Sequence, residues 1–207
     1  MFKTKIFTAA ALALGLSSAA LAQNVVGRAL VDGEKVVLFS DRTWAFESAG
    51  SDNCRQIHAE VQFCGNSNDW QTTTVPSPDV SAAYRFDDRH YAQFIIEAFG
   101  TKDGVTARMM RDIVIENAAT GTGQTKENVT VISVEDTTVD GIAAETVVYQ
   151  FAVDNLDVVF ANSLVITQDL TMQAITYAIA SDYSDLHKRL HADVIAATKL
   201  PNKSGRK

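Results

Sequence analysis

The chain has 207 residues, of which 46% are hydrophobic and 21% charged, so it is long enough for about one globular domain with a small appendage. Its formal net charge is −7 at pH 7. Nucleic acids and anionic lipids are bound through patches of Lys and Arg, and this acidic chain has one basic cluster, over residues 199–207. We therefore expect no nucleic-acid partner, and we interpret residues 201–207 as a flexible tail.

The first 22 residues have the pattern of a secretory signal peptide. Lys3 and Lys5 form a charged start, residues 6–16 form an apolar run, and small residues ending at Ala22 fit a cleavage site before Gln23. A membrane anchor would need about 20 apolar residues, and this run is shorter. We therefore predict cleavage after Ala22 and a periplasmic or secreted protein that does not span a membrane once the signal is removed. The mature chain would keep 16 basic and 25 acidic residues, a net charge of −9.

Residues 23–47 predict a small three-stranded β-meander. Asp32-Gly33 is a strong hairpin-turn dipeptide, and it stands between two runs rich in β-branched and apolar residues. Isolated sheets of this size are marginal in water, so we expect the unit to dock on the main domain or on another protein. Trp44 and Phe46 share one face of the third strand and are the candidate partner-binding surface.

Residues 48–79 predict a linker followed by a disulfide-bonded loop. In an oxidising compartment, Cys54 and Cys64 are most simply a disulfide. Their spacing does not fit a C-x-x-C redox pair, and two sulfurs alone do not complete a zinc tetrahedron. Trp70 is expected to pack against the sheet of the domain that follows.

Residues 80–200 predict an α+β domain, in which an antiparallel β-sheet is flanked by two helices. A hairpin over residues 81–100 and a helix over 105–119 come first, and a helix over 183–199 closes the domain. Between the helices the sequence predicts four strands, over residues 129–135, 142–153, 158–166 and 171–179. Their joins carry turn chemistry, at Asp140-Gly141, Asp154-Asn155 and Gln168-Asp169. Joins this short make an antiparallel meander, and both of its faces carry apolar residues that need covering.

Each helix has an apolar stripe at helical spacing that predicts packing on the sheet. The stripe of the first helix comprises Val105, Met109 and Ile113, with Met110 and Val114 beside them. The stripe of the second comprises Tyr183, Leu186, Leu190, Val194 and Ala197. The expected N-terminal caps are Asp103 for the first helix and Ser181-Asp182 for the second.

His187 and His191 stand four residues apart on the second helix, so their rings can point the same way and clasp one metal ion. The pattern lacks the glutamate of a zincin motif, which makes these histidines weak candidates for a metal site. The competing interpretation is a pair of histidines that border the core stripe and are solvated on one edge.

Residues 87–90 place two acids, a base and an imidazole in one predicted turn, where adjacent carboxylates can serve as an acid/base pair. Asp is also an ordinary turn residue, because its side chain accepts hydrogen bonds from nearby backbone amides. The sequence has no nucleophile elbow, no S-x-x-K motif and no phosphate-binding glycine motif. We therefore expect no enzymatic activity and no cofactor.

Several segments of residues 80–200 carry a resemblance to a known fold family. They are Tyr91-Ala92-Gln93-Phe94-Ile95-Ile96-Glu97, Val139-Asp140-Gly141, Phe160-Ala161-Asn162-Ser163 and the last strand with Gln173. With its element order, this region resembles the PsbP-like α/β/α sandwich of small exported bacterial proteins. Separately, residues 27–46 resemble a hairpin module found at the N-termini of exported bacterial proteins. The resemblance implies a non-enzymatic accessory or binding role in an envelope compartment, and it carries over no catalytic residue.

The sequence thus favours an exported, non-enzymatic interaction or accessory module of the bacterial envelope, with an unknown protein or small ligand as its partner. Two alternatives stay open. One is a metal or small-ligand binding protein that uses His187 and His191, and the other is a hydrolase with an unrecognised site near residues 87–90.

Overall fold

The structure is a computed structural model that describes residues 25–31, 34–40, 42–46 and 54–200. The chain divides into two compact units, Met1–Ser48 and Ala49–Lys207. The predicted signal peptide (1–22), the first linker residues (48–53) and the predicted tail (201–207) lie outside the described residues.

The first unit is a three-stranded antiparallel sheet of β1 (Val25–Val31), β2 (Glu34–Phe39) and β3 (Trp44–Phe46), as the sequence predicted. Val36 in its middle strand is buried. The Trp44 side chain is 53% exposed. Phe46 pairs with Val36 through the backbone, and its side chain lies outside the described residues.

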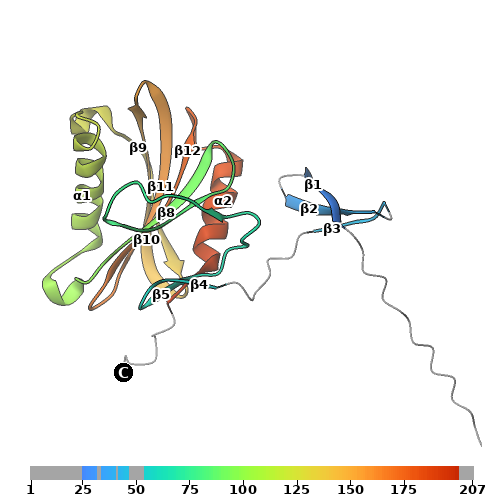
Figure 1. The fold of residues 1–207 in the computed structure, drawn as a ribbon. Coiled ribbons are helices and arrows are strands. Elements are labelled where there is room, and N and C mark those ends of the chain that lie inside the picture. Colours follow the sequence, from blue (N-terminus) through green and yellow to red (C-terminus); the bar gives the residue numbers. More distant parts are fainter. Residues whose placement is uncertain (1–24, 32–33, 41, 47–53, 201–207) are drawn as a thin grey trace, which may run out of the picture. The chain divides into compact units, whose positions relative to one another are not determined.

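The second unit is built on a seven-stranded antiparallel sheet with the order β6-β7-β8-β12-β11-β10-β9 (Figure 1). Its strands are β6 (Gln71–Thr72), β7 (Val80–Arg85), β8 (His90–Glu97), β9 (Thr130–Val139), β10 (Ile142–Val153), β11 (Leu156–Ile166) and β12 (Thr171–Ile179). The predicted four-strand meander is confirmed, and the hairpin β7–β8 pairs its last strand on the far side. Two of the joins in the meander are two-residue hairpin turns, Asp140-Gly141 and Asp154-Asn155. All four of these residues have positive φ, as tight hairpin turns require.

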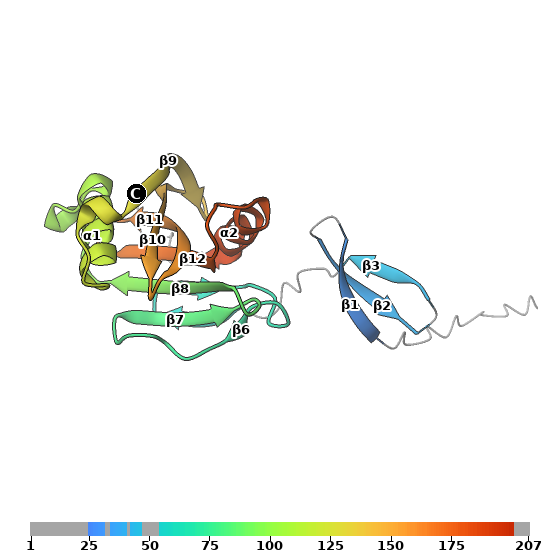
Figure 2. The ribbon, with the colours of Figure 1, turned by 90° about the horizontal axis from the view of Figure 1, so that it is seen from above.

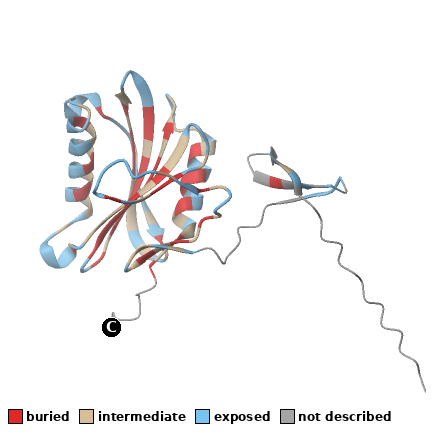
Figure 3. Cartoon of the chain, viewed as in Figure 1, coloured by how far each residue is buried: buried red, intermediate tan, exposed pale blue. Residues whose placement is uncertain are grey.

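Helices α1 (Ala107–Thr120) and α2 (Asp185–Ala197) cover opposite faces of this sheet, so the fold is the predicted α+β sandwich (Figure 2). Alternation along β10 divides the core, since Val147 packs with α1 residues while Val148 faces the other way. The short 3₁₀ turns η1 (Thr101–Asp103) and η2 (Lys126–Asn128) flank α1. Buried residues concentrate along the central strands and the inner faces of the helices (Figure 3).

The apolar stripe predicted for the first helix is one residue out of phase. Met110 and Val114 are buried, whereas Met109 is 48% and Ile113 44% exposed. Both pairs have the i,i+4 spacing of a packing stripe, and the pattern alone does not say which pair meets the sheet.

The N-terminal cap predicted for the first helix, Asp103, was also wrong, because Thr106 accepts the hydrogen bond from the amide of Met109.

The second helix also differs from its prediction at both ends. Ser184 caps it by accepting a hydrogen bond from the amide of His187, in place of Ser181-Asp182. At its C-terminus the chain leaves the helix, and Thr198–Lys199 forms β13, which pairs with the strand β5 (Val61–Phe63). The helix therefore ends at Ala197, because the next two residues, which were predicted to be helical, form a strand of a small sheet.

A second, three-stranded sheet has the order β13-β5-β4, with β4 at Arg55–His58, and the sequence did not predict it. The predicted disulfide between Cys54 and Cys64 is confirmed beside it. Phe63 and Trp70 are buried in the core shared with α2, as predicted for Trp70. The domain therefore extends beyond residues 80–200, since part of the predicted linker and loop region supplies core side chains.

The corrected phase of α1 predicts different costs for two adjacent methionines. Met110→Ala should lower the free energy of unfolding by about 2–5 kcal/mol, because it leaves a cavity in the core. Met109→Ala should change it by no more than about 0.5 kcal/mol, because that side chain is exposed. Urea unfolding of both variants checks the assignment, and equal losses would contradict it.

Candidate binding site: the groove between strand β9 and helix α2

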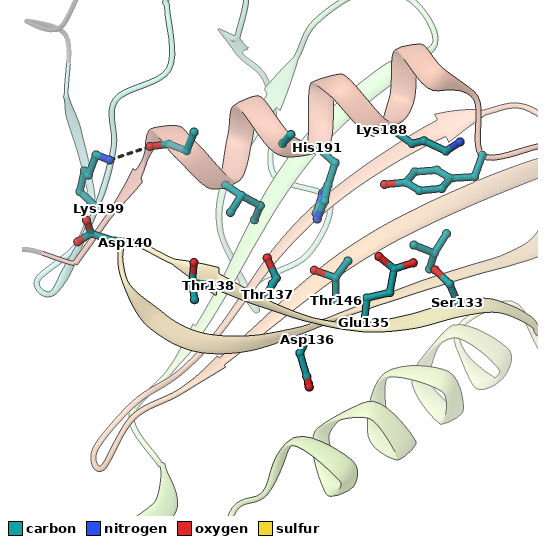
Figure 4. A pocket seen from close by; sticks show the side chains of 15 residues that line it. Ser133, Glu135, Asp136, Thr137, Thr138, Asp140, Thr146, Lys188, His191 and Lys199 are labelled. Atoms are coloured by element: carbon teal, nitrogen blue, oxygen red, sulfur yellow. Dashed lines mark hydrogen bonds between the residues drawn. The ribbon is translucent and has the colours of Figure 1, made fainter.

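A groove of about 460 Å³ lies between β9 and α2, on the sheet face that α2 covers in part (Figure 4). Its volume falls in the range of about 300–1,000 Å³ that is usual for small-molecule sites. Strands β9 and β10 provide Ser133, Glu135, Thr137, Thr146 and Val148, and α2 with the residue before its cap provides Tyr183, Lys188, His191, Ala192 and Ile195.

Strand register determines which side chains line the floor of the groove. Glu135 on β9 pairs directly with Thr146 on β10, so their side chains emerge on the same face as near neighbours. The side chains of Glu135, Thr146 and His191 approach the same space from the two strands and the helix (Figure 4). Asp136, the next residue of β9, points to the opposite face.

Behind the groove, a chain of buried polar side chains joins α2 to the sheet. The Thr176 hydroxyl lies 3.0 Å from both His187 Nε2 and His191 Nδ1. The other ring nitrogen of His191, Nε2, lies 2.9 Å from the Ser163 hydroxyl, and Ser163 lies 2.7 Å from the hydroxyl of Thr146. We call these five residues the polar relay, and it runs from His187 in the core to Thr146 at the groove.

The network itself assigns its protons. Thr176 has one proton to donate, so one of its two histidine neighbours must donate to it. His187 Nδ1 is buried and has no hydrogen-bond partner among the described residues, and a buried unpaired N–H is more costly than a bare ring nitrogen. The proton of His187 therefore sits on Nε2 and is donated to Thr176.

The remaining bonds follow from this first one. Thr176 donates to His191 Nδ1, so the proton of His191 sits on Nε2 and is donated to Ser163. Ser163 in turn donates to the Thr146 hydroxyl. The proton of Thr146 is left for the groove, and the relay thereby presents a hydrogen-bond donor at its floor.

Both histidines of the relay are neutral at ordinary pH. His187 and His191 are 1% and 6% exposed, which corrects the interpretation that they are solvated on one edge. Burial lowers the pKa of His187 to about 4 from 6.5. Burial, with the neighbouring His187 as a second cause, lowers the pKa of His191 to about 3.

The Ser163–His191 contact has the spacing of a nucleophile and its base, yet the environment is that of a structural contact. Ser163 is completely buried, so no substrate reaches its hydroxyl in this arrangement. The second ring nitrogen of His191 meets the Thr176 hydroxyl where a catalytic triad would place a carboxylate. The relay is therefore suited to hold α2 on the sheet and to orient Thr146.

The predicted site residues lie in separate places. His187 and His191 share the Thr176 hydroxyl, and the described part of the chain holds no group of three or more His, Cys, Asp or Glu placed for a metal ion. Cys54 and Cys64 are bonded to each other beside β4 and β5. Trp44 belongs to the first unit.

The turn at residues 87–90 is held by its own hydrogen bonds. Asp87 Oδ1 accepts from the amides of Arg89 and His90 at 2.8 Å each, and His90 Nδ1 lies 2.9 Å from the same oxygen. Partial burial would raise the pKa of Asp87, but the hydrogen bonds from Arg89 and His90 lower it overall. These contacts are those of a turn, as the sequence favoured, and the His90 ring lies edge-on to His187 at 6.3 Å.

Sequence reasoning missed the relay hydroxyls of Thr146, Ser163 and Thr176. A signal was present, since Ser163 and Thr176 stand on the α2-facing side of two central strands, and the other buried residues on that side are apolar. Two buried hydroxyls below two histidines one turn apart on a helix predict a hydrogen-bonded network between the helix and the sheet.

Comparison with known proteins identifies the fold. No protein-family model matches the chain, and no curated protein matches it in sequence. The solution structure of cyanobacterial PsbP (CyanoP) from Synechocystis sp. PCC 6803 matches with a TM-score of 0.51 and 18% identity, over 75% of this chain and 97% of that one. The second unit therefore has a PsbP-like fold, as the resemblance implied.

Two further matches are weaker. LpqN, which is involved in cell envelope biogenesis of Mycobacterium tuberculosis, matches with a TM-score of 0.46 and 12% identity, over 64% of this chain and 78% of that one. A protein of Bacteroides thetaiotaomicron matches with a TM-score of 0.47 and 10% identity, over 72% of this chain and 47% of that one. Among the described residues, no helix has the length and apolar character needed to cross a membrane.

The burial of the relay predicts a pH-dependent stability. Because the pKa of His187 in the folded protein is about 4 and its ordinary value is 6.5, the unfolded chain takes up this proton more readily. The neutral His187 ring therefore contributes its full stabilisation of the folded protein above about pH 6.5. This stabilisation decreases as the pH falls, and about 3 kcal/mol of it is lost at about pH 4. His187→Gln keeps an amide for Thr176 but does not titrate.

Urea unfolding of the wild type and of His187→Gln at neutral and acidic pH tests this. The wild type should lose about 3 kcal/mol more than the variant when the pH is lowered from about 7 to about 4. Parallel pH profiles would show that His187 does not titrate with a lowered pKa.

Proposed function

We propose that this chain is an exported, non-catalytic accessory module of the bacterial cell envelope that binds a protein partner or small ligand. The observation that carries the proposal is the burial of Ser163 and His191. In the pair that most resembles a catalytic constellation, the Ser163 hydroxyl is closed off from solvent and both nitrogens of His191 are bonded to hydroxyls, while the accessible groove beside the pair offers donors and acceptors for binding.

The disulfide supports export, because bonds of this kind persist in oxidising compartments and are rare in the cytosol. The signal-like pattern of residues 1–22 points the same way. The fold that the second unit shares with cyanobacterial PsbP is compatible with an accessory role.

The first unit is proposed to supply a docking surface for a protein partner. It is a small sheet, and Trp44 on its third strand is more than half exposed. A large aromatic side chain at an accessible position is the type of residue that dominates binding energy at interfaces. Phe46, two residues along the same strand, is the proposed second contact.

A metal site at His187 and His191 is the second candidate, favoured by the unpartnered Nδ1 of His187. It would require His191, whose two ring nitrogens are both bonded, to give up its bond to Thr176 or to Ser163. A hydrolase site at residues 87–90 is the third, and it would require Asp87 to release the backbone amides that it now accepts from.

Cross-linking in the native envelope tests the proposal. Trp44→Ala should reduce the cross-linked adduct at least tenfold, because loss of an interface tryptophan costs more than about 1.4 kcal/mol. Val26→Ala, at an exposed position of β1, should leave the adduct unchanged.

Thiol labelling of the same samples tests whether the protein is exported. The cysteines of the exported protein should react with a maleimide only after reduction, since Cys54 and Cys64 are bonded. A wild-type protein retained in the cytosol with reactive thiols would refute export, and an adduct insensitive to Trp44→Ala would refute the docking surface.

A further inference from the structure

The charged side chains around the groove are acidic in excess. Glu135, Asp136 and Asp140 carry negative charges, and Lys188 and Lys199 carry positive ones. Lys188 pairs with Asp185 at 3.0 Å, and Lys199 donates to the carbonyl of Ala196 at 2.7 Å. An anionic ligand would therefore meet like charges without gaining a dedicated counter-charge.

The floor of the groove places an acceptor beside a donor. The Glu135 carboxylate and the Thr146 hydroxyl stand on directly paired positions of β9 and β10. Their Cβ atoms are therefore about 5 Å apart, as in other cross-strand pairs. Ser163 fills the acceptor side of the Thr146 hydroxyl, so Thr146 offers its proton outward, while a carboxylate accepts from two hydroxyl groups at once. This pair matches a ligand with hydroxyl groups on adjacent carbons.

Tyr183 adds an aromatic surface at one end of the groove. Its ring packs edge-on to His187, with the ring centroids 5.0 Å apart, and Lys188 Nζ lies 5.8 Å from the Tyr183 ring centroid, while the residue stays partly accessible. Burial, and next the negative charge of Glu135, raise the pKa of its hydroxyl to about 12, so the hydroxyl remains protonated. Val148, Ala192 and Ile195 complete an apolar wall.

From these features we infer that the groove between β9 and α2 binds a polyhydroxylated, non-anionic ligand of the oligosaccharide class. The C–H face of a sugar ring lies against Tyr183 and the apolar wall, while adjacent ring hydroxyls donate to Glu135 and accept from Thr146. The inference rests on the proposed binding role and adds to it the site and the chemical class of the ligand.

The same geometry disfavours an extended peptide as the occupant. Peptides are commonly held in grooves beside a sheet by backbone pairing with an edge strand. Strand β9 is an edge strand, but the groove lies over the face of the sheet and offers side-chain hydroxyls and a carboxylate from neighbouring positions of β9 and β10. That arrangement suits closely spaced hydroxyl groups better than the alternating carbonyl and amide groups of a peptide.

Calorimetric titration of the purified mature protein with two trisaccharides of one length tests the ligand class. Neutral triacetylchitotriose should bind, whereas the anionic trigalacturonate should bind at least tenfold more weakly. A capped, uncharged peptide should show no heat. Equal or tighter binding of trigalacturonate or of the peptide would overturn the inference, as would no binding of triacetylchitotriose up to about 10 mM.

Four variants test the site. Glu135→Ala and Thr146→Val should each weaken binding of triacetylchitotriose at least tenfold. Asp112→Ala removes the same kind of charge from an exposed position of α1, on the opposite face of the sheet, and Thr146→Ser keeps the hydroxyl. Both controls should bind within twofold of the wild type, and unchanged binding by Glu135→Ala and Thr146→Val would overturn the site.

One measurement on the wild type is independent of any effect of the variants on folding. The side-chain NMR signals of His191 and Tyr183 should shift on addition of triacetylchitotriose, and unshifted signals with measurable binding would place the ligand elsewhere. Absence of saccharide binding in a protein that is exported and cross-linked through Trp44 would overturn this inference alone. Saccharide binding by a protein that is not exported would overturn the proposed envelope role alone.

Discussion

The structure depends on a polar interaction in a place where most domains have only apolar contacts. Two neutral histidines of α2 lie against the sheet, and each is bonded to the hydroxyl of Thr176. A buried polar group without a partner costs about 1–3 kcal/mol, so this packing is stable only when the hydroxyls of the sheet meet the rings in register. The relay thus sets where α2 lies and how it is rotated about its axis.

The position of α2 in turn creates the groove. The helix contacts β12 and carries the core residues Leu190 and Val194 beneath it, while β9 lies at the far edge of a seven-stranded sheet. A single helix is about 10 Å across and neighbouring strands are about 4.8 Å apart, so one helix does not cover this face. The uncovered part over β9 and β10 is the groove, and the last hydroxyl of the relay opens into it (Figure 4).

What was predictable from the sequence is what local chemistry determines. Turn residues such as Asp140-Gly141 and Asp154-Asn155 adopt positive φ, and with β-branched runs between them they specified the four strands, although β9 extends to Val139, four residues beyond its predicted end. The phase of α1 was not predictable, because Met109 and Met110 belong to equally good stripes and only the sheet decides between them. The partners of His187 and His191 were not predictable either, since Ser163 and Thr176 reach them only through the tertiary fold.

Both histidines are neutral and carry their protons on Nε2, so that the relay points its last donor into the groove. Nitrogen-15 NMR of the histidine side chains distinguishes the two neutral tautomers and the imidazolium ion. At about pH 6, above both pKa values, His187 and His191 should each give the signals of a neutral ring protonated at Nε2. A charged ring, or a proton on Nδ1 of either residue, would contradict the account.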